Sequence, residues 1–129
     1  MPAKGQLSIL VVDDTTVSRA LICDALHHIG ITRVAIAKDG QHALEVIKTT
    51  PANLVISDMN MPNLDGLGLL RALRTNGPTQ KVGFILVTGL PDKSLIEQGQ
   101  KLGLNNFLPK PFTHQSVRAC IEQVVGKLV

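Results

Sequence analysis

Five polar side chains of this sequence lie where short apolar runs end. They are three carboxylates, one hydroxyl and one ammonium, namely Asp13, Asp14, Asp58, Thr88 and Lys110. A short apolar, β-branched run predicts a buried strand. If these strands are parallel, their carboxyl ends meet at one edge of the sheet, where open α/β sheets bind ligands. The five side chains are therefore expected to converge on one site.

The chemistry of such a site follows from its charges. Crowded carboxylates repel one another, so at neutral pH they either bind protons or recruit a cation. Mg²⁺ is usually held by a few carboxylates, a backbone carbonyl and waters, with positions left for phosphate oxygens. Lys110 would add a point positive charge and Thr88 a hydrogen bond. The set is complementary to a phosphoryl group, for which Asp58 is the candidate nucleophile.

Five strand–helix units position these side chains. The strands are predicted at 7–12, 32–37, 54–58, 82–88 and 105–108, and a helix follows each of them. Strands that are apolar on both sides of the pleat predict a parallel sheet with helices on both faces. The predicted fold class is therefore α/β, an open, doubly wound sheet.

Two features of the helices bear on the later argument. The first helix, which Thr15 or Thr16 would cap and Gly30 would end, carries an apolar stripe at helical spacing that is expected to be buried. The stripe consists of Val17, Leu21, Ile22, Ala25, Leu26 and Ile29. Cys23 and Cys120 lie on predicted helices without metal-ligand spacing, so both are expected to be buried thiols.

Length and composition limit the possible functions. The chain has 129 residues, 44% of them hydrophobic and 2% aromatic, which fits one globular domain with an aliphatic core. No apolar run reaches the ~18 residues of a membrane span, so we expect a cytoplasmic protein without a membrane partner. The net charge is +3, but the basic residues are scattered and stacking aromatics are nearly absent. Nucleic acid is therefore not an expected partner.

These residues, in their order and spacing, resemble the receiver domain of two-component response regulators. The matching motifs are Asp13-Asp14, Asp58, Met61-Pro62-x-x-Asp65-Gly66, Thr88-Gly89 and Lys110-Pro111-Phe112. The stretch from Asp58 to Leu67 is especially similar to the single-domain CheY-type regulators of chemotaxis. The resemblance implies the flavodoxin-like strand order 2-1-3-4-5 with five helices. It also implies a single receiver domain over residues 1–129, with its core at about 6–128 and no output domain.

The resemblance also implies a role for each site residue. Asp58 would accept a phosphoryl group from a histidine kinase of the chemotaxis type. Asp14, Asp58 and the backbone carbonyl of Asn60 would ligate Mg²⁺ (or Mn²⁺), and Asp13 would act on the metal through water. Thr88 and Lys110 would each bind a phosphoryl oxygen. The Lys110-Pro111 peptide is expected to be cis, as it is in the family.

The output implied by the resemblance is a conformational switch that a monomer passes to noncovalent partners, a flagellar motor switch protein or a phosphatase. Phe107 stands where many chemotaxis regulators have a mobile tyrosine, and it lacks the hydroxyl that a partner could bind. Leu90 and Asn60 stand where side chains set how fast water reaches the phosphoryl group. Since Leu90 cannot orient water, slow self-dephosphorylation is expected.

Other functions remain open from the sequence. Within the receiver class, the protein could instead be a phosphate sink or a phosphorelay intermediate. A phosphatase with an aspartyl nucleophile would need an acid two residues after it, and Asp58 is followed by Met59 and Asn60. A flavodoxin-like nucleotide binder would need a phosphate loop where Asp13 and Asp14 stand. We therefore expect no enzyme beyond one that catalyses its own phosphorylation and dephosphorylation.

Overall fold

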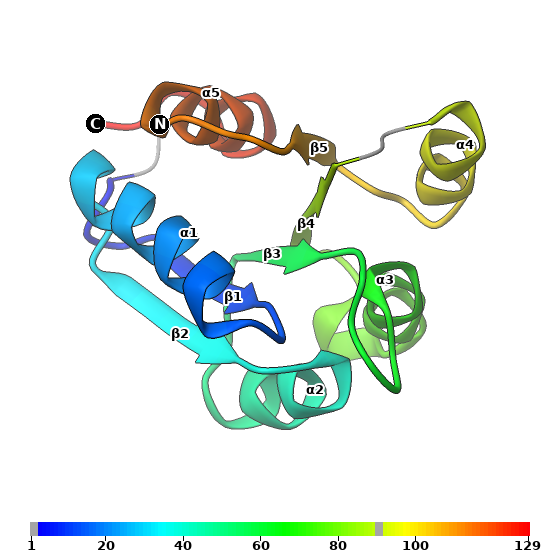
Figure 1. The fold of residues 1–129 in the computed structure, drawn as a ribbon. Coiled ribbons are helices and arrows are strands. Elements are labelled where there is room, and N and C mark those ends of the chain that lie inside the picture. Colours follow the sequence, from blue (N-terminus) through cyan, green and yellow to red (C-terminus); the bar gives the residue numbers. More distant parts are fainter. Residues whose placement is uncertain (1–2, 90–91) are drawn as a thin grey trace.

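A computed structural model describes residues 3–89 and 92–129, which form one five-stranded parallel sheet with helices on both faces (Figure 1). The strands are β1 (Ser8–Val12), β2 (Arg33–Ala37), β3 (Leu54–Asp58), β4 (Gly83–Thr88) and β5 (Asn106–Pro109). The helices are α1 (Thr16–Ile29), α2 (Gly40–Thr49), α3 (Gly66–Thr75), α4 (Lys93–Lys101) and α5 (His114–Val125), with a short 3₁₀ helix η1 (Gly77–Thr79). The strand order is β2-β1-β3-β4-β5, which confirms the predicted fold class.

The strands are apolar on both sides because two separate clusters cover the sheet. One cluster packs α1 and α5 against one face, and the other packs α2, α3 and the inner side of α4 against the opposite face (Figure 1). Neighbouring residues of β1 alternate between them, with Ile9 and Val11 in the first and Leu10 and Val12 in the second. Burial on both faces is typical of a parallel sheet and leaves the strand ends at its edge to form a site.

The apolar stripe of α1 is buried only in part, which corrects the sequence prediction. Ile22, Ala25, Leu26 and Ile29 are buried, but Val17 is 74% exposed and Leu21 56% exposed. Leu21 lines an open pocket beside the β5–α5 loop instead of the core. Helical periodicity shows which residues share a face, but it does not show how far the neighbouring elements extend over that face.

Helix ends agree with the sequence prediction at Gly30 but not at Thr15. Gly30 ends α1 with φ 103°, a left-handed conformation that favours glycine. Asp65 caps α3 by accepting a hydrogen bond from Gly68 N at 2.8 Å. Thr15 stands at the N-cap position of α1, but its hydroxyl makes no cap hydrogen bond. Of the two cysteines, Cys120 is buried as expected, whereas Cys23 is only partly buried.

Candidate active site at the carboxyl edge of the sheet

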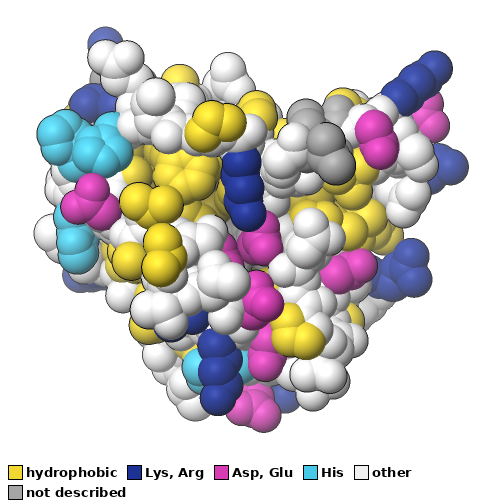
Figure 2. All heavy atoms as spheres, viewed as in Figure 1, with side chains coloured by type: hydrophobic (Ala, Val, Ile, Leu, Met, Phe, Trp, Pro, Cys, Tyr) yellow, Lys and Arg dark blue, Asp and Glu magenta, His cyan; other side chains and the backbone are white. Residues whose placement is uncertain are grey.

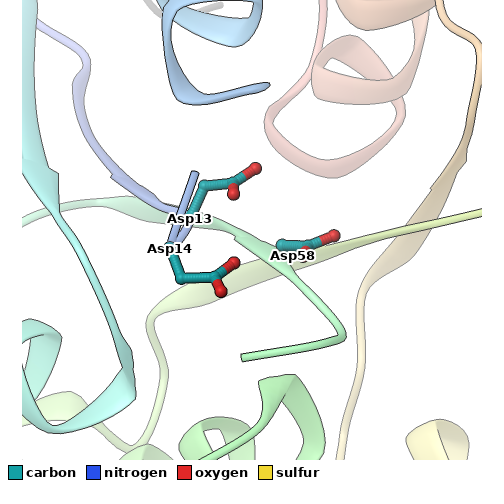
Figure 3. A group of neighbouring side chains, drawn as sticks. All are labelled: Asp13, Asp14 and Asp58. Carbon is teal, nitrogen blue, oxygen red and sulfur yellow. The ribbon is translucent and has the colours of Figure 1, made fainter. Parts of the chain in front are cut away.

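Three carboxylates meet where β1 and β3 end (Figure 3). Asp13 and Asp14 follow β1, and Asp58 is the last residue of β3, the strand beside it. Each offers an oxygen, and the three oxygens lie within 4.8 Å of one another. Asp13 and Asp58 are 1% and 6% exposed, while Asp14 faces solvent. The structure thus brings together the acids that the sequence placed at separate strand ends.

Lys110 lies directly opposite this cluster. Its Nζ donates a hydrogen bond to Asp58 Oδ1 at 2.8 Å, and the lysine side chain is 36% exposed against 8% for the aspartate. The backbone of Lys110 is held by a hydrogen bond from its N–H to Thr88 O at 2.9 Å. The Lys110-Pro111 peptide is cis, as expected. Thr88 itself is buried at the end of β4, the strand between β3 and β5.

The Asp58 carboxyl has a pKa raised above its ordinary value. Burial is the largest cause, and the charges of Asp13 and Asp14 raise the pKa further. The hydrogen bond and the charge of Lys110 act in the opposite direction but do not outweigh burial. Burial and the neighbouring acids thus disfavour the charged form of Asp58, and a further cation at the site would favour it.

The carboxylate of Asp13 is held at one oxygen and free at the other. Asp13 Oδ1 accepts hydrogen bonds from Thr15 N at 3.0 Å and Thr15 Oγ1 at 3.1 Å. Arg19 Nη1 donates to the carbonyl oxygen of Asp13 at 2.8 Å. Asp13 Oδ2 is buried, and among the described residues it has no hydrogen-bond partner. Buried carboxylate oxygens rarely lack a hydrogen-bond partner, which indicates that Asp13 Oδ2 is a binding atom for a ligand.

The contacts of Thr15 and Arg19 with Asp13 were not predicted from the sequence. Thr15 or Thr16 was expected only to cap the helix, and nothing in the periodicity of α1 indicates that Arg19 reaches back to the start of its helix. The hydroxyl two residues after Asp13 could have suggested the local Asp13–Thr15 bonds, because short polar side chains often form hydrogen bonds to groups nearby in the chain.

These residues fit a hard divalent cation. At Mg–O distances of 2.0–2.1 Å, two oxygens on one ion lie about 3–4 Å apart, so the cluster needs only small side-chain shifts. The donors are carboxylate oxygens without sulfur or imidazole, which is the set that Mg²⁺ prefers over softer metals. The unpartnered Asp13 Oδ2 supplies a buried oxygen that such an ion, or a water bound to it, would satisfy.

The loop between β3 and α3 sets the backbone of Asp58. Met59 N donates to Val87 O at 3.1 Å, and Gly66 N donates to Met59 O at 2.9 Å. A Cβ on Gly66 would lie 2.7 Å from Asp58 O, so only glycine lets α3 begin this close to the acid. Asn60 lies in this loop, exposed to solvent and two residues after Asp58.

Two predicted residues lie farther from the acids. Phe107 is a partly buried residue of β5 that packs with the α2–α4 cluster, and a Cβ on Gly99 of α4 would lie 3.4 Å from its ring. The ring of Phe107 thus packs against α4 and connects β5 to this helix. Leu90 lies outside the described residues.

Apolar surface flanks the site on the side of α1. We define the α1 patch as Val17 and Leu21 of α1 with Pro111 and Phe112 of the β5–α5 loop. Leu21, Pro111, Phe112 and Lys110 line the same pocket, so the patch adjoins the lysine that pairs with Asp58. In the space-filling view, acidic side chains gather at the centre of this face, next to a basic one and to apolar surface (Figure 2).

Comparison with known families identifies the class of protein to which this site belongs. The sequence profile of the response regulator receiver domain matches residues 9–122, so the chain belongs to the response regulator receiver family. The chain is 43% identical over 128 residues to a probable chemotaxis protein CheY of Rhizobium etli, covering 99% of both chains. The protein is thus homologous to CheY-type regulators, and its fold and family are those of a phosphorylation-activated signalling switch.

Solved structures agree with this assignment. Chemotaxis protein CheY4 of Vibrio cholerae is 25% identical with a TM-score of 0.86, covering 92% of this chain and 98% of that one. The receiver domain of a sensor histidine kinase from Pseudomonas aeruginosa is 26% identical with a TM-score of 0.83, covering 94% and 98%. That structure has a magnesium ion coordinated in its active site cleft.

The comparisons do not favour the phosphatase or the nucleotide-binding alternative. Within the described residues, no helix is long and apolar enough to cross a membrane.

Proposed function

We propose that Asp58 of this protein accepts a phosphoryl group from a histidine kinase of a chemotaxis-type pathway and thereby switches the domain between two conformations. The observation that carries the proposal is the buried carboxylate of Asp58, which lies between two further acids and the Nζ of Lys110. A nucleophilic carboxylate needs both a counter-charge for the incoming group and relief from the neighbouring acids.

Bound Mg²⁺ (or Mn²⁺) would reduce the repulsion between Asp58 and the neighbouring acids. Asp14, Asp58 and the backbone carbonyl of Asn60 would ligate it, and Asp13 would bind it through water. When bound, the ion neutralises charge on the carboxylates and on the phosphoryl oxygens. The free Oδ2 of Asp13 and the exposed position of Asp14 support this division between a water-mediated and a direct ligand.

In the transfer, an oxygen of Asp58 forms a bond to phosphorus as the bond between phosphorus and the donor's imidazole nitrogen breaks. The electron pair of that bond returns to the imidazole. Lys110 already donates to Asp58 Oδ1, so its ammonium is in place to pair with an oxygen of the new acyl phosphate. The hydroxyl of Thr88 would bind a second phosphoryl oxygen from the end of β4. Charge neutralisation and positioning then supply most of the catalysis.

A protein donor that brings a histidine to Asp58 would also contact the α1 patch, because this patch adjoins Lys110. Burial of exposed Leu21 and Val17 would favour such a complex. L21D should therefore slow phosphorylation by the kinase while leaving phosphorylation by a small-molecule donor unchanged. Equal slowing with both donors would place Leu21 in the chemistry or the fold and refute the docking role.

The output would pass through noncovalent partners. Phosphorylation can shift the two conformations only through contacts that differ between them, and Thr88 is the candidate for such a contact. Phe107 of β5, which packs against α4, would carry the change to that helix. The partner is a flagellar motor switch protein, or the protein drains phosphate from the kinase as a sink. Binding of the phosphorylated form to a motor-switch peptide separates these two outputs.

We further propose that the protein acts on no substrate other than itself. It would catalyse its own phosphorylation and the hydrolysis of its own acyl phosphate. Asp58 is followed by Met59 and Asn60, so the acid that a phosphatase needs is missing. Turnover of free phosphomonoesters by the purified protein would contradict this proposal.

The proposal is tested with a phosphoryl mimic. Beryllium fluoride with Mg²⁺ should change the amide spectrum of the wild type by nuclear magnetic resonance, with shifts concentrated at the carboxyl ends of β1, β3 and β4. The matched variant D58N should show no such change, because it lacks the carboxylate that binds the mimic. Equal spectra for the wild type with and without the mimic would overturn the assignment.

A further inference from the structure

Arg19 makes an unusual contact for a residue in the second turn of a helix. Its side chain is partly buried and folds back to donate from Nη1 to the carbonyl oxygen of Asp13 at 2.8 Å. The N–H of Asp13 donates to Ala37 O of β2 at 3.1 Å. The backbone of Asp13 is therefore held from both sides, by the neighbouring strand and by the guanidinium.

Thr15 completes the hold on Asp13. Its N–H and its hydroxyl both donate to Asp13 Oδ1, at 3.0 and 3.1 Å. Three of the four polar atoms of Asp13 are thus engaged. The fourth is Oδ2, which is buried at the acidic cluster and lacks a hydrogen-bond partner within the described part of the chain. With Thr15 and Arg19 bound to its other oxygens, Asp13 can contact a ligand at the site only through Oδ2.

We propose that Arg19, supported by Thr15, is a positioning residue for divalent-cation binding, because it fixes the direction in which Asp13 presents Oδ2. This inference rests on the proposed function, since it concerns the same ion. Arg19 bonds a carbonyl and not a carboxylate, so it orients the cluster without neutralising any of its three acids. Residues that orient a metal ligand typically change metal affinity 10–100-fold when they are removed.

The charge of Arg19 and its hydrogen bond to Asp13 predict opposite changes in Mg²⁺ affinity when Arg19 is removed. A positive charge close to the site repels a dication, so on charge alone the removal of Arg19 would tighten Mg²⁺ binding. On geometry, removal releases the carbonyl of Asp13, leaves its backbone held only through the N–H bond to Ala37 O, and weakens Mg²⁺ binding. Solvent screens the charge of a partly exposed guanidinium, whereas the hydrogen bond to the Asp13 carbonyl is lost outright. The sign of the change in affinity therefore decides between the two.

The experiment measures the Mg²⁺ dissociation constant by isothermal titration calorimetry, because the chain has no Trp or Tyr to report binding. R19M should bind Mg²⁺ about tenfold more weakly or worse. R71M removes an exposed arginine from α3 and should stay within about twofold of the wild type, as expected for a surface change. Thermal unfolding in EDTA tests separately whether the variants are equally stable.

A conservative variant and a second residue make the test decisive. R19K keeps the charge and one donor, so it should recover part of the affinity, and a lysine variant as weak as R19M overturns the role of the hydrogen bond. If R19M does not fold, T15V replaces it. T15V loses the Oγ1 hydrogen bond but keeps the N–H bond, so a smaller loss of affinity is expected and an unchanged affinity overturns the proposal.

The two proposals of this site fail in different ways. A wild-type protein that binds no Mg²⁺ refutes the ion site and with it the proposed function. A wild type that binds Mg²⁺ alongside an R19M that binds equally well or better refutes only the role of Arg19.

Discussion

Replacing Gly66 by alanine should damage the site through the backbone of Asp58. The new Cβ would lie 2.5 Å from Leu86 Cδ1, 2.7 Å from Asp58 O and 3.0 Å from Met59 Cα, where ordinary contacts are 3.4–4 Å. Two of these neighbours are backbone atoms, one at the end of β3 and one in the first residue after it, and backbone cannot rotate away as a side chain can. The start of α3 and the end of β3 must therefore separate by a substantial part of an ångström.

The cost follows from overpacking. Forcing a methyl group into a packed core costs about 1–3 kcal/mol, against a gain of about 0.5–1 kcal/mol from replacing glycine in a helix. We expect G66A to lower the free energy of unfolding by about 1–2 kcal/mol, or the Tm by roughly 4 °C per kcal/mol. At temperatures where it is folded, phosphorylation by a small-molecule donor should also be slower than in the wild type.

Gly5 provides the matched control. Apart from its chain neighbours, no atom lies within 4 Å of a Cβ built on this exposed glycine, and its φ is not in the left-handed region. G5A should therefore stay within about 0.5 kcal/mol of the wild type or be slightly more stable. The assay is thermal unfolding by circular dichroism, together with the phosphorylation rate. A G66A protein as stable and as readily phosphorylated as G5A would refute the argument that Gly66 sets the position of Asp58.

Three further predictions follow from the ionisable groups. Burial raises the folded-state pKa of Asp58, so the native state binds this proton more tightly than the unfolded state does. In EDTA the wild type should therefore lose stability relative to D58N as the pH rises from the ordinary carboxyl pKa through the raised one. Parallel curves of stability against pH for the two proteins would contradict this. Burial raises the pKa of Cys120 to about 11, so at pH 8 only about one thiol in a thousand is ionised. Alkylation of Cys120, measured by mass spectrometry, should therefore require unfolding, and rapid labelling of the native protein would be the opposing result. Arg74 donates hydrogen bonds to four oxygens around the starts of β4 and β5. In urea unfolding, R74M should therefore lower the free energy of unfolding by about 1–3 kcal/mol, while R71M changes it little. Equal effects of the two substitutions would show that the hydrogen bonds of Arg74 contribute nothing.

The sequence predicted the site at the level of strand ends. β3 begins and ends at Leu54 and Asp58 as predicted, because an apolar run that stops at a charge marks where burial stops. The topology then brings Lys110, which follows β5, to Asp58 at the end of β3, because parallel strands place their carboxyl ends at one edge of the sheet.

Other features could not be predicted because they depend on what packs against a residue. The spacing of Val17 and Leu21 matches that of the buried residues of α1, but the first turns of this helix extend beyond the elements that would cover them. The hydroxyl of Thr15 could equally cap its helix or bond Asp13, and the structure decides for Asp13. Arg19 reaches the carbonyl of Asp13 only because its long side chain folds back along the helix, and helical spacing does not show the direction of a side chain.

The most direct test of the central claim is the intact mass of the protein after incubation with a small-molecule phosphodonor and Mg²⁺. The wild type should gain the mass of one phosphoryl group, which is lost again on mild base treatment as expected for an acyl phosphate. D58N should gain none, and the wild type should gain none in EDTA. A wild type that stays unmodified, or a D58N that is modified equally, would contradict the account.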